Sequence, residues 1–240
     1  NILTLKYTVK AIAAQHGLVA SFMPKPIYGI NGSGMHCHQS LFNANGENLF
    51  FDPKDDFYIS PLGYGFIAGQ LAHARALAAV VSPTVNSYKR LVPGYEAPVY
   101  VGWAQINRSA LIRIPHYTPG REKSIRAELR FPDPSANPYL ALTVMLAAAL
   151  DGIDNNLPCP KPLTNVNVYG LTEEDRLAMD IAELPGSLAE SLRELEADQV
   201  LQEALGSMIY ETFTRAKWAE VDDYRMSVTD WEVERYLETA

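Results

Sequence analysis

Two short segments of the chain carry ionisable or polar side chains at every second position. Residues 35–42 contain a His-x-His-x-Ser pattern, and residues 126–130 contain Arg-x-Glu-x-Arg. Because side chains alternate between the two faces of a β-strand, each pattern would place its polar groups on one face and its other residues on the opposite face. The residues expected on the polar faces are His36, His38, Ser40, Arg126, Glu128 and Arg130.

An imidazole nitrogen and a carboxylate together form a ligand set for a divalent cation. The arginines beside Glu128 would keep its carboxylate ionised. Their planar guanidinium groups could donate paired hydrogen bonds to phosphate or carboxylate oxygens. Each pattern also has a plain structural interpretation. His-x-His is common on exposed strands, and Arg-x-Glu-x-Arg can be a surface ladder of ion pairs. The two patterns together favour a site over either structural interpretation.

Basic residues are concentrated in one part of an acidic chain. The net charge is −8, yet residues 89–130 hold eight Lys and Arg against three Asp and Glu. Such a cluster indicates an anionic ligand. A pI of about 5.1 and the absence of a nucleic-acid-binding motif argue against DNA or RNA. A small polyanion such as a nucleoside triphosphate fits better, although no Walker A loop or dinucleotide-binding glycine pattern is present.

Hydrophobic periodicity predicts the elements that must position these residues. Helical spacing with start and stop signals indicates helices, and short β-rich runs between turns indicate strands. The predicted helices cover residues 4–15, 60–81, 139–150, 187–197, 202–221 and 229–238. The predicted strands cover residues 18–23, 35–42, 99–103, 110–114 and 125–131. This order predicts an α+β protein with a helical, acidic C-terminal part.

Other features limit the class of protein. The apolar stretches are too short to cross a membrane, and residues 1–10 do not have the pattern of a secretory signal. The two cysteines match no metal-ligand spacing or disulfide framework, which is consistent with a reducing cytosol, so we expect a cytoplasmic protein. The absence of an initiator Met hints at a fragment. A proline-rich connector is predicted at residues 158–162.

Several blocks of sequence resemble the glutamine synthetase family, specifically the C-terminal part of the catalytic domain of the type I enzymes. The blocks follow the family's order and spacing over essentially the whole chain. They are residues 31–36 (NGSGMH), 89–98 (KRLVPGYEAP), 107–115 (NRSALIRIP), 126–130 (RAELR) and 133–139 (DPSANPY).

The resemblance implies a fold and its boundaries. It implies an antiparallel sheet that forms part of a catalytic funnel, flanked by helices and followed by a helical tail. Residues 1–160 would form the sheet and carry the site, and residues 161–240 would form the acidic helical tail. An N-terminal β-grasp domain and the first part of the catalytic domain would be absent from this chain.

The resemblance also implies a reaction. The family joins glutamate to ammonia with ATP as a substrate, through γ-glutamyl phosphate, and uses Mg²⁺ or Mn²⁺. The partners implied are glutamate, ammonium and ATP, with no nucleic acid or membrane. The family's type I members assemble as a homo-oligomer of two rings of six subunits.

Residue roles follow from matching each motif to the family pattern. The resemblance implies metal ligation by His36 and Glu128. It implies glutamate binding by Asn31, Gly32, Arg90, Glu96 and Arg130. It implies nucleotide binding by His38, Ser40, Arg108, Arg113 and Lys123. It implies catalytic roles for Glu96, Arg90 and Arg108, with Glu96 taking a proton from ammonium.

Two alternatives remain open. A relative that attaches glutamate to an amine or polyamine would share the metal and nucleotide blocks but need not keep an acid at Glu96. A non-catalytic homologue would also keep the fold. The acidic ligands of a second metal site would lie upstream of residue 1, so we expect the isolated chain to bind metal and nucleotide weakly and to be inactive.

Overall fold

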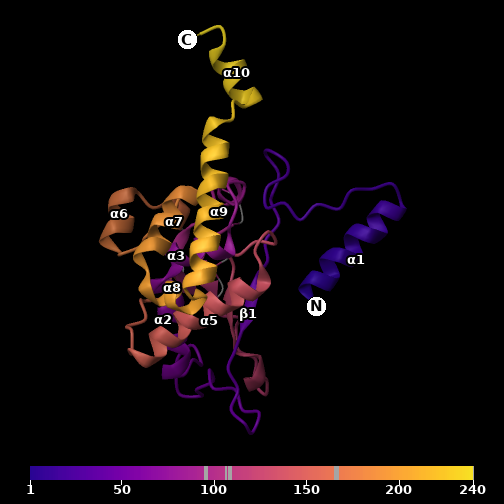
Figure 1. Ribbon diagram of the computed structural model, residues 1–240. Helices are drawn as coiled ribbons and strands as arrows, with labels where there is room; N and C mark the ends of the chain where they lie inside the picture. Colours follow the sequence, from indigo (N-terminus) through magenta and orange to yellow (C-terminus); the bar gives the residue numbers. More distant parts are fainter. Residues whose placement is uncertain (95–96, 106, 108–109, 165–167, 240) are drawn as a thin grey trace.

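A four-stranded sheet lies at the centre of the computed structural model, which describes residues 1–94, 97–105, 107, 110–164 and 168–239 (Figure 1). The strands are β1 (Cys37–Gln39), β2 (Tyr100–Ala104), β3 (Ala110–Arg113) and β4 (Ala127–Leu129), and their order in the sheet is β1-β4-β3-β2. Four of the five predicted strands are therefore confirmed, although each is shorter than or offset from its predicted range.

The sheet is mixed. Strand β4 pairs antiparallel with both β1 and β3, as expected, but β2 and β3 run parallel with an irregular register between Tyr100 and Trp103. The α+β class is confirmed, and the expectation of a wholly antiparallel sheet is corrected at this pair. Alternation along a strand fixes which face each side chain takes, and it has the same period in parallel and antiparallel pairs.

Helices α2 (Pro61–Ala72), α3 (Ala74–Val81) and α5 (Pro138–Asp154) form the buried helical layer. Ser60 and Asn137 cap α2 and α5, and a proline opens each helix. The predicted helix over 60–81 is two helices, because the backbone at His73 leaves helical geometry. Helices α2 and α5 approach so closely that a Cβ on Gly69 would lie 2.0 Å from the carbonyl oxygen of Ala148.

The C-terminal third is helical, as predicted. Its elements are α6 (Glu173–Ala178), α7 (Leu188–Ala197), α8 (Gln199–Leu205), α9 (Ser207–Met226) and α10 (Asp230–Tyr236). The helix predicted over 202–221 is divided at Gly206, which adopts a φ of 72°. In Figure 1, α9 runs along the body of the molecule and α10 lies beyond its upper end. Helix α6 has a capping box at Thr172 and was not predicted.

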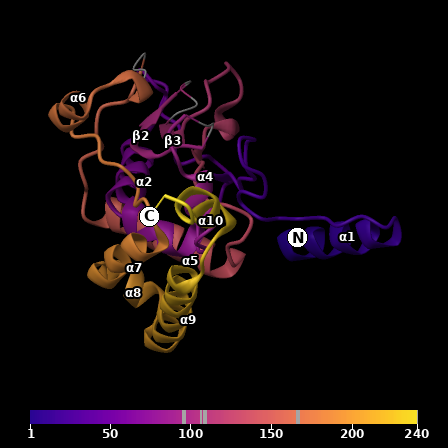
Figure 2. The same cartoon turned by 90° about the horizontal axis from the view of Figure 1, so that it is seen from above.

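Helix α1 (Ile2–Gln15) lies to one side of the body in both views (Figures 1 and 2). None of its residues is buried, although Lys6 Nζ donates a 2.6 Å hydrogen bond to the carbonyl oxygen of Pro134. The strand predicted for residues 18–23 is wrong, because this segment pairs with no other strand. Two short elements near the site, α4 (Ser87–Arg90) and the 3₁₀ turn η1 (Glu122–Ser124), were also not predicted.

No helix among the described residues is long and apolar enough to cross a membrane.

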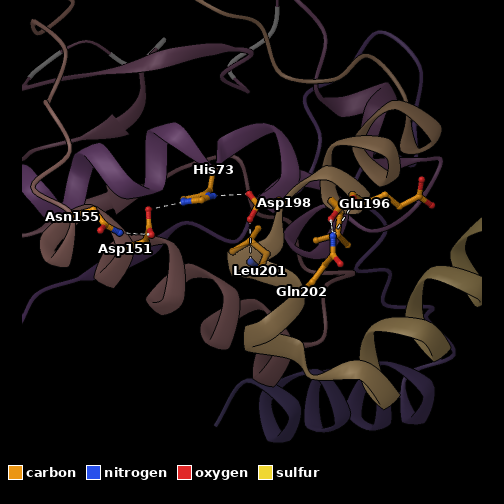
Figure 3. Close-up of polar contacts among 8 residues, drawn as sticks. His73, Asp151, Asn155, Glu196, Asp198, Leu201 and Gln202 are labelled. Atoms are coloured by element: carbon orange, nitrogen blue, oxygen red, sulfur yellow. Dashed lines mark hydrogen bonds and ion pairs between the residues drawn. The ribbon is translucent and has the colours of Figure 1, made fainter.

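His73 connects the junction of two helices to two further helices through its imidazole ring (Figure 3). It lies at the junction of α2 and α3, and its Nδ1 is 2.5 Å from Asp198 Oδ2 at the start of α8. Its Nε2 is 3.1 Å from Asp151 Oδ2 on α5. Burial opposes protonation of the ring, but the hydrogen bonds to Asp198 and then Asp151 outweigh it, so the pKa of His73 is raised. The protonated ring can donate from both nitrogens and therefore holds the two carboxylates together.

The raised pKa of His73 predicts a pH-dependent contribution to stability. The contribution is complete below the unfolded-state pKa and is lost as the pH rises through the higher folded-state pKa. We expect His73→Gln to lower the free energy of unfolding by about 1 to 2 kcal/mol near pH 6 and by less than half of that near pH 9. Urea unfolding at both pH values measures the difference. His16→Gln, at an exposed position after α1, is the control. An equal loss at both pH values for His73→Gln would contradict the assignment.

Candidate functional site

Three strands bring one imidazole, one carboxylate and one guanidinium into a row across the sheet. His38 on β1 lies opposite Glu128 on β4, and Glu128 lies opposite Arg113 on β3. Directly opposed residues share a face, so the three side chains project to the same side. Ala127 and Leu129, on the other face of β4, are fully buried. The predicted division of the Arg-x-Glu-x-Arg strand into a polar and an apolar face is therefore confirmed.

Glu128 is the centre of the polar cluster, and its side chain is 2% exposed. Arg113 donates to Oε2 from Nε at 2.6 Å and approaches the same oxygen with Nη2 at 2.5 Å. On the other oxygen, Oε1, His36 Nδ1 lies at 3.0 Å and Arg130 Nε at 3.5 Å. A nearly buried carboxylate thus has cationic or imidazole partners at both oxygens.

A pocket of about 250 Å³ opens beside this cluster. Two of its walls are the buried guanidinium groups of Arg90 and Arg130. Arg90 donates to the carbonyl oxygens of Phe131 (2.7 Å) and Arg130 (3.1 Å), which fixes the plane of its guanidinium. Burial lowers the pKa of Arg90 to about 10, so it remains a cation at neutral pH. The pocket is lined by Lys25, Asn31, Gly32, Gly34, His36, Arg90, Ala97 and Arg130.

The glycines of the NGSGMH segment let its backbone approach the pocket. Ser33 N donates to the carbonyl oxygen of Pro24 at 2.8 Å, and a Cβ on Gly32 would lie 2.1 Å from that oxygen. A Cβ on Gly34 would lie 2.6 Å from Arg90 Nη2 and 3.3 Å from His36 Nε2. Gly32 is therefore required by a backbone contact, and Gly34 by the position of Arg90.

The two histidines of the His-x-His pattern have different partners. Burial, followed by the positive charge of Arg130, lowers the pKa of His36 and favours a neutral imidazole. His38 accepts a 2.9 Å hydrogen bond at Nδ1 from Arg126 Nε, and Arg126 Nη1 donates to the carbonyl oxygen of Ser124 at 2.9 Å. Burial is also the main cause that lowers the pKa of His38.

The structure brings together most of the residues predicted from sequence. Five surround the pocket, namely Asn31, Gly32, His36, Arg90 and Arg130. His38, Arg113 and Glu128 form the cross-strand row, and Ser40 follows β1 in a half-buried position. Lys123 lies on η1 and lines a separate shallow pocket formed by residues 120–124. Glu96 and Arg108 lie outside the described residues.

Sequence reasoning assigned no role to Lys25. Its backbone N–H donates to Asn86 Oδ1 at 2.8 Å, and Asn86 Nδ2 donates back to its carbonyl oxygen at 3.0 Å. These bonds hold Lys25 against the start of α4, the helix that carries Arg90. The one available signal in the sequence was a Lys-Pro pair before a glycine-rich segment. That signal does not reveal the contact with Asn86, because the two residues are 61 positions apart.

Asp133 is fully buried and belongs to the block 133–139, but sequence reasoning assigned it no role in the site. Ser135 donates to its Oδ1 from the backbone N–H at 2.8 Å and from the hydroxyl at 2.5 Å. Burial raises the pKa of Asp133, and the charge of Arg90 acts in the opposite direction. Asp133 therefore lies within electrostatic reach of Arg90, one of the two buried arginines of the pocket.

His36 and Glu128 fit one part of a divalent-cation site. Their facing atoms are 3.0 Å apart, which is close to the separation of two adjacent ligands about 2.1 Å from one octahedral ion. A neutral imidazole and a carboxylate suit such an ion chemically. Within the described ranges no group of three or more His, Cys, Asp or Glu side chains could hold a metal, so these two residues supply only part of a coordination shell.

Comparison with known proteins gives one family. The profile described as "Glutamine synthetase, catalytic domain" matches residues 1–236. A glutamine synthetase of Thermus thermophilus is 54% identical over 239 residues, which covers 100% of this chain and 52% of that protein. A glutamine synthetase of Methanocaldococcus jannaschii is 52% identical over 238 residues, covering 99% of this chain and 51% of that protein.

Solved structures agree with this result. The structure of GmaS without ligand superposes with a TM-score of 0.85 at 39% identity, covering 98% of this chain and 52% of that one. A complex of GmaS with ADP gives a TM-score of 0.87 at 38% identity, covering 98% of this chain and 53% of that one. The chain spans about half the length of the curated relatives it matches. It belongs to the glutamine synthetase family and corresponds to part of the family's catalytic domain.

Proposed function

We propose that the chain contributes to the ATP-dependent ligation of glutamate and ammonia to glutamine through γ-glutamyl phosphate. The observation that carries this proposal is the convergence of His36, Glu128, Arg113, Arg130 and Arg90 around one small polar pocket in a chain of this family. Phosphoryl transfer depends mainly on positioned cationic groups around the reacting oxygens, and this cluster supplies them.

Neither of the two chemical steps requires a nucleophilic side chain of the protein. In the first, an oxygen of the γ-carboxylate of glutamate bonds to the γ-phosphorus of ATP, and ADP leaves. In the second, ammonia bonds to the acyl carbon, and inorganic phosphate leaves with the electrons of the acyl C–O bond. The protein must bind the two anions close together, keep water away and accept a proton from ammonium.

Residues of the pocket are the proposed glutamate site. Arg90 and Arg130 are buried cations that suit carboxylate oxygens, and Asn31 and Gly32 lie at the rim. His36 and Glu128 would hold a divalent cation, Mg²⁺ or Mn²⁺, between this pocket and the phosphates. Bound there, the ion would neutralise negative charge on the phosphoryl oxygens.

The proposed nucleotide contacts are His38, Ser40, Arg108, Arg113 and Lys123. His38 and Arg113 flank Glu128 on the same face, so phosphates next to the metal pair would lie within their reach. Glu96 is the proposed proton acceptor, and Arg90 and Arg108 complete the proposed catalytic set. The roles of Glu96 and Arg108 rest on the motif match alone.

Assembly and location remain predictions. A homo-oligomer of two rings of six subunits, a cytoplasmic location and the division at residues 160 and 161 follow from the resemblance and the sequence. The isolated chain is proposed to bind nucleotide and metal weakly and to lack turnover.

Transfer of the chain into a relative tests the proposed function. In the chimera, this chain replaces its 54%-identical counterpart in the glutamine synthetase of Thermus thermophilus. We expect the chimera to form glutamine from glutamate, ammonium and ATP. Incorporation of ¹⁵N-ammonium into the amide, followed by NMR, measures the product. His36→Ala and Glu128→Ala should each reduce turnover by roughly 10²- to 10³-fold. A folded chimera that binds ADP but forms no glutamine would count against the proposal.

Substitution of Glu96 separates ammonia ligation from amine ligation. If this carboxylate accepts the proton of ammonium, Glu96→Gln in the chimera should reduce glutamine formation by roughly 10²- to 10⁴-fold, because a general base would be lost. Parallel assays measure the amide product formed from ammonium and from methylamine, compared at the same rate of ADP release. Loss of less than about threefold, together with preferred use of methylamine, would favour a glutamate–amine ligase.

Gly34→Ala tests the proposed glutamate pocket. The new Cβ would collide with Arg90 Nη2, whose position depends on its bond to the Arg130 carbonyl oxygen. We expect the KM for glutamate in the chimera to rise roughly ten-fold or more, with a smaller change in kcat. Gly186→Ala is the control, because the nearest atom to its Cβ would be Glu190 Oε2 at 3.7 Å. An unchanged KM for glutamate would place the substrate elsewhere.

A further inference from the structure

The carboxylate of Glu128 has Arg113 as its tightest partner. Arg113 approaches Oε2 with both Nε and Nη2, at 2.6 and 2.5 Å, whereas His36 and Arg130 share Oε1 at longer distances. A carboxylate buried to this extent requires compensation of its charge, because removal of an ion from water costs several kcal/mol. Arg113 makes the shortest of the contacts that compensate this charge.

A divalent cation on Glu128 and His36 would need the same carboxylate. It would bring positive charge next to the guanidinium of Arg113 and would withdraw electron density from both oxygens of Glu128. Two cationic groups that share one buried carboxylate repel each other at short range. The ion and Arg113 therefore compete for Glu128.

The two side chains differ in their freedom to move. Glu128 is 2% exposed and lies in the middle of β4, between strands on both sides. The side chain of Arg113 is 32% exposed, and Arg113 is the last residue of β3. Rotation of the arginine is therefore the movement that the structure permits, since Glu128 cannot turn away without disturbing buried neighbours.

We propose that Arg113 and a divalent cation are alternative partners of Glu128, so that Arg113 must leave the carboxylate before the ion binds with full affinity. The released guanidinium fork then becomes available to a phosphate group on the same face of the sheet. This inference rests on the proposed function, and it deepens that function by making metal and nucleotide binding mutually favourable.

A variant that keeps the charge of Arg113 separates competition from a fixed ion pair. If Arg113 only holds Glu128 in position while the metal binds Oε1 and His36, its removal changes metal affinity through charge alone, and Arg113→Lys should bind like the unchanged chain. If Arg113 competes with the metal for the carboxylate, loss of the planar fork should strengthen metal binding in Arg113→Lys as well as in Arg113→Ala. Comparison of the two variants therefore distinguishes the two arrangements.

Binding of Mn²⁺ alone to the 240-residue chain tests the proposal. Electron paramagnetic resonance of free Mn²⁺ gives the dissociation constant without any assay of activity. We expect Arg113→Ala to bind Mn²⁺ roughly ten-fold more tightly than the unchanged chain, because a charged hydrogen-bond competitor is removed. Arg113→Lys, which keeps the charge but loses the planar fork, should fall between the two, and circular dichroism verifies that each variant is folded.

Arg126→Ala is the matched control. Arg126 lies on the same face two residues from Glu128, but its Nε donates to His38. Its removal changes the local net charge by the same amount, so it measures the general electrostatic effect on cation binding. We expect less than about a twofold change in Mn²⁺ affinity for this variant.

The outcomes separate the inference from the proposed function. Tighter binding by Arg113→Ala and, to a smaller degree, by Arg113→Lys, little change for Arg126→Ala, and loss of binding by His36→Ala and Glu128→Ala support both. Arg113→Lys that binds like the unchanged chain, or equal or weaker binding by Arg113→Ala, with binding still lost in His36→Ala and Glu128→Ala, overturns the competition and leaves the metal pair intact. Mn²⁺ binding that survives His36→Ala and Glu128→Ala, or that is absent from every variant, overturns the competition together with the metal pair.

Discussion

The cost of burying the Glu128 carboxylate governs the arrangement of the site. A charge that is 2% exposed is tolerated only where opposite charges and hydrogen-bond donors replace the lost water. Those partners come from separate segments, Arg113 from β3 and His36 from the residues just before β1. The register of β1, β4 and β3 must therefore be correct before the buried carboxylate is stabilised, and a slip of one residue would move Glu128 to the apolar face.

The same principle extends to the pocket beside the cluster. Arg90 and Arg130 are both buried cations, and Arg90 donates hydrogen bonds to two backbone carbonyl oxygens. Backbone carbonyls orient a guanidinium without neutralising it, so the positive charge remains available to an anionic ligand. Asp133, which is fully buried, interacts electrostatically with Arg90. A pocket built in this way presents two buried guanidinium groups to the space beside Glu128.

The helical layer explains why these strands can be short. Helices α2, α3 and α5 supply much of the buried apolar surface, and their close contact at Gly69 and Ala148 packs them densely. His73 and its two aspartates join this layer to the C-terminal helices. The core therefore anchors the apolar face of the sheet, and the polar face is left for the charged cluster.

The sequence alone was sufficient for features that depend on local periodicity and local caps. Alternation predicted the polar face with Glu128 and the apolar face with Ala127 and Leu129, and helical spacing predicted α1, α5 and α7 within a few residues. The motif blocks contain all the residues that line the pocket except Lys25. These signals are local because strand alternation and helix starts are determined by neighbouring residues.

Only the tertiary structure determined the features that depend on distant neighbours. The break at His73, the parallel pairing of β2 with β3 and the unpaired segment 18–23 follow from packing between remote parts of the chain. So do the hydrogen bonds of Lys25 to Asn86 and the contact of Arg126 with His38. The choice of Arg113 as the main partner of Glu128 has the same origin, because strand order and register decide which cation reaches a buried carboxylate.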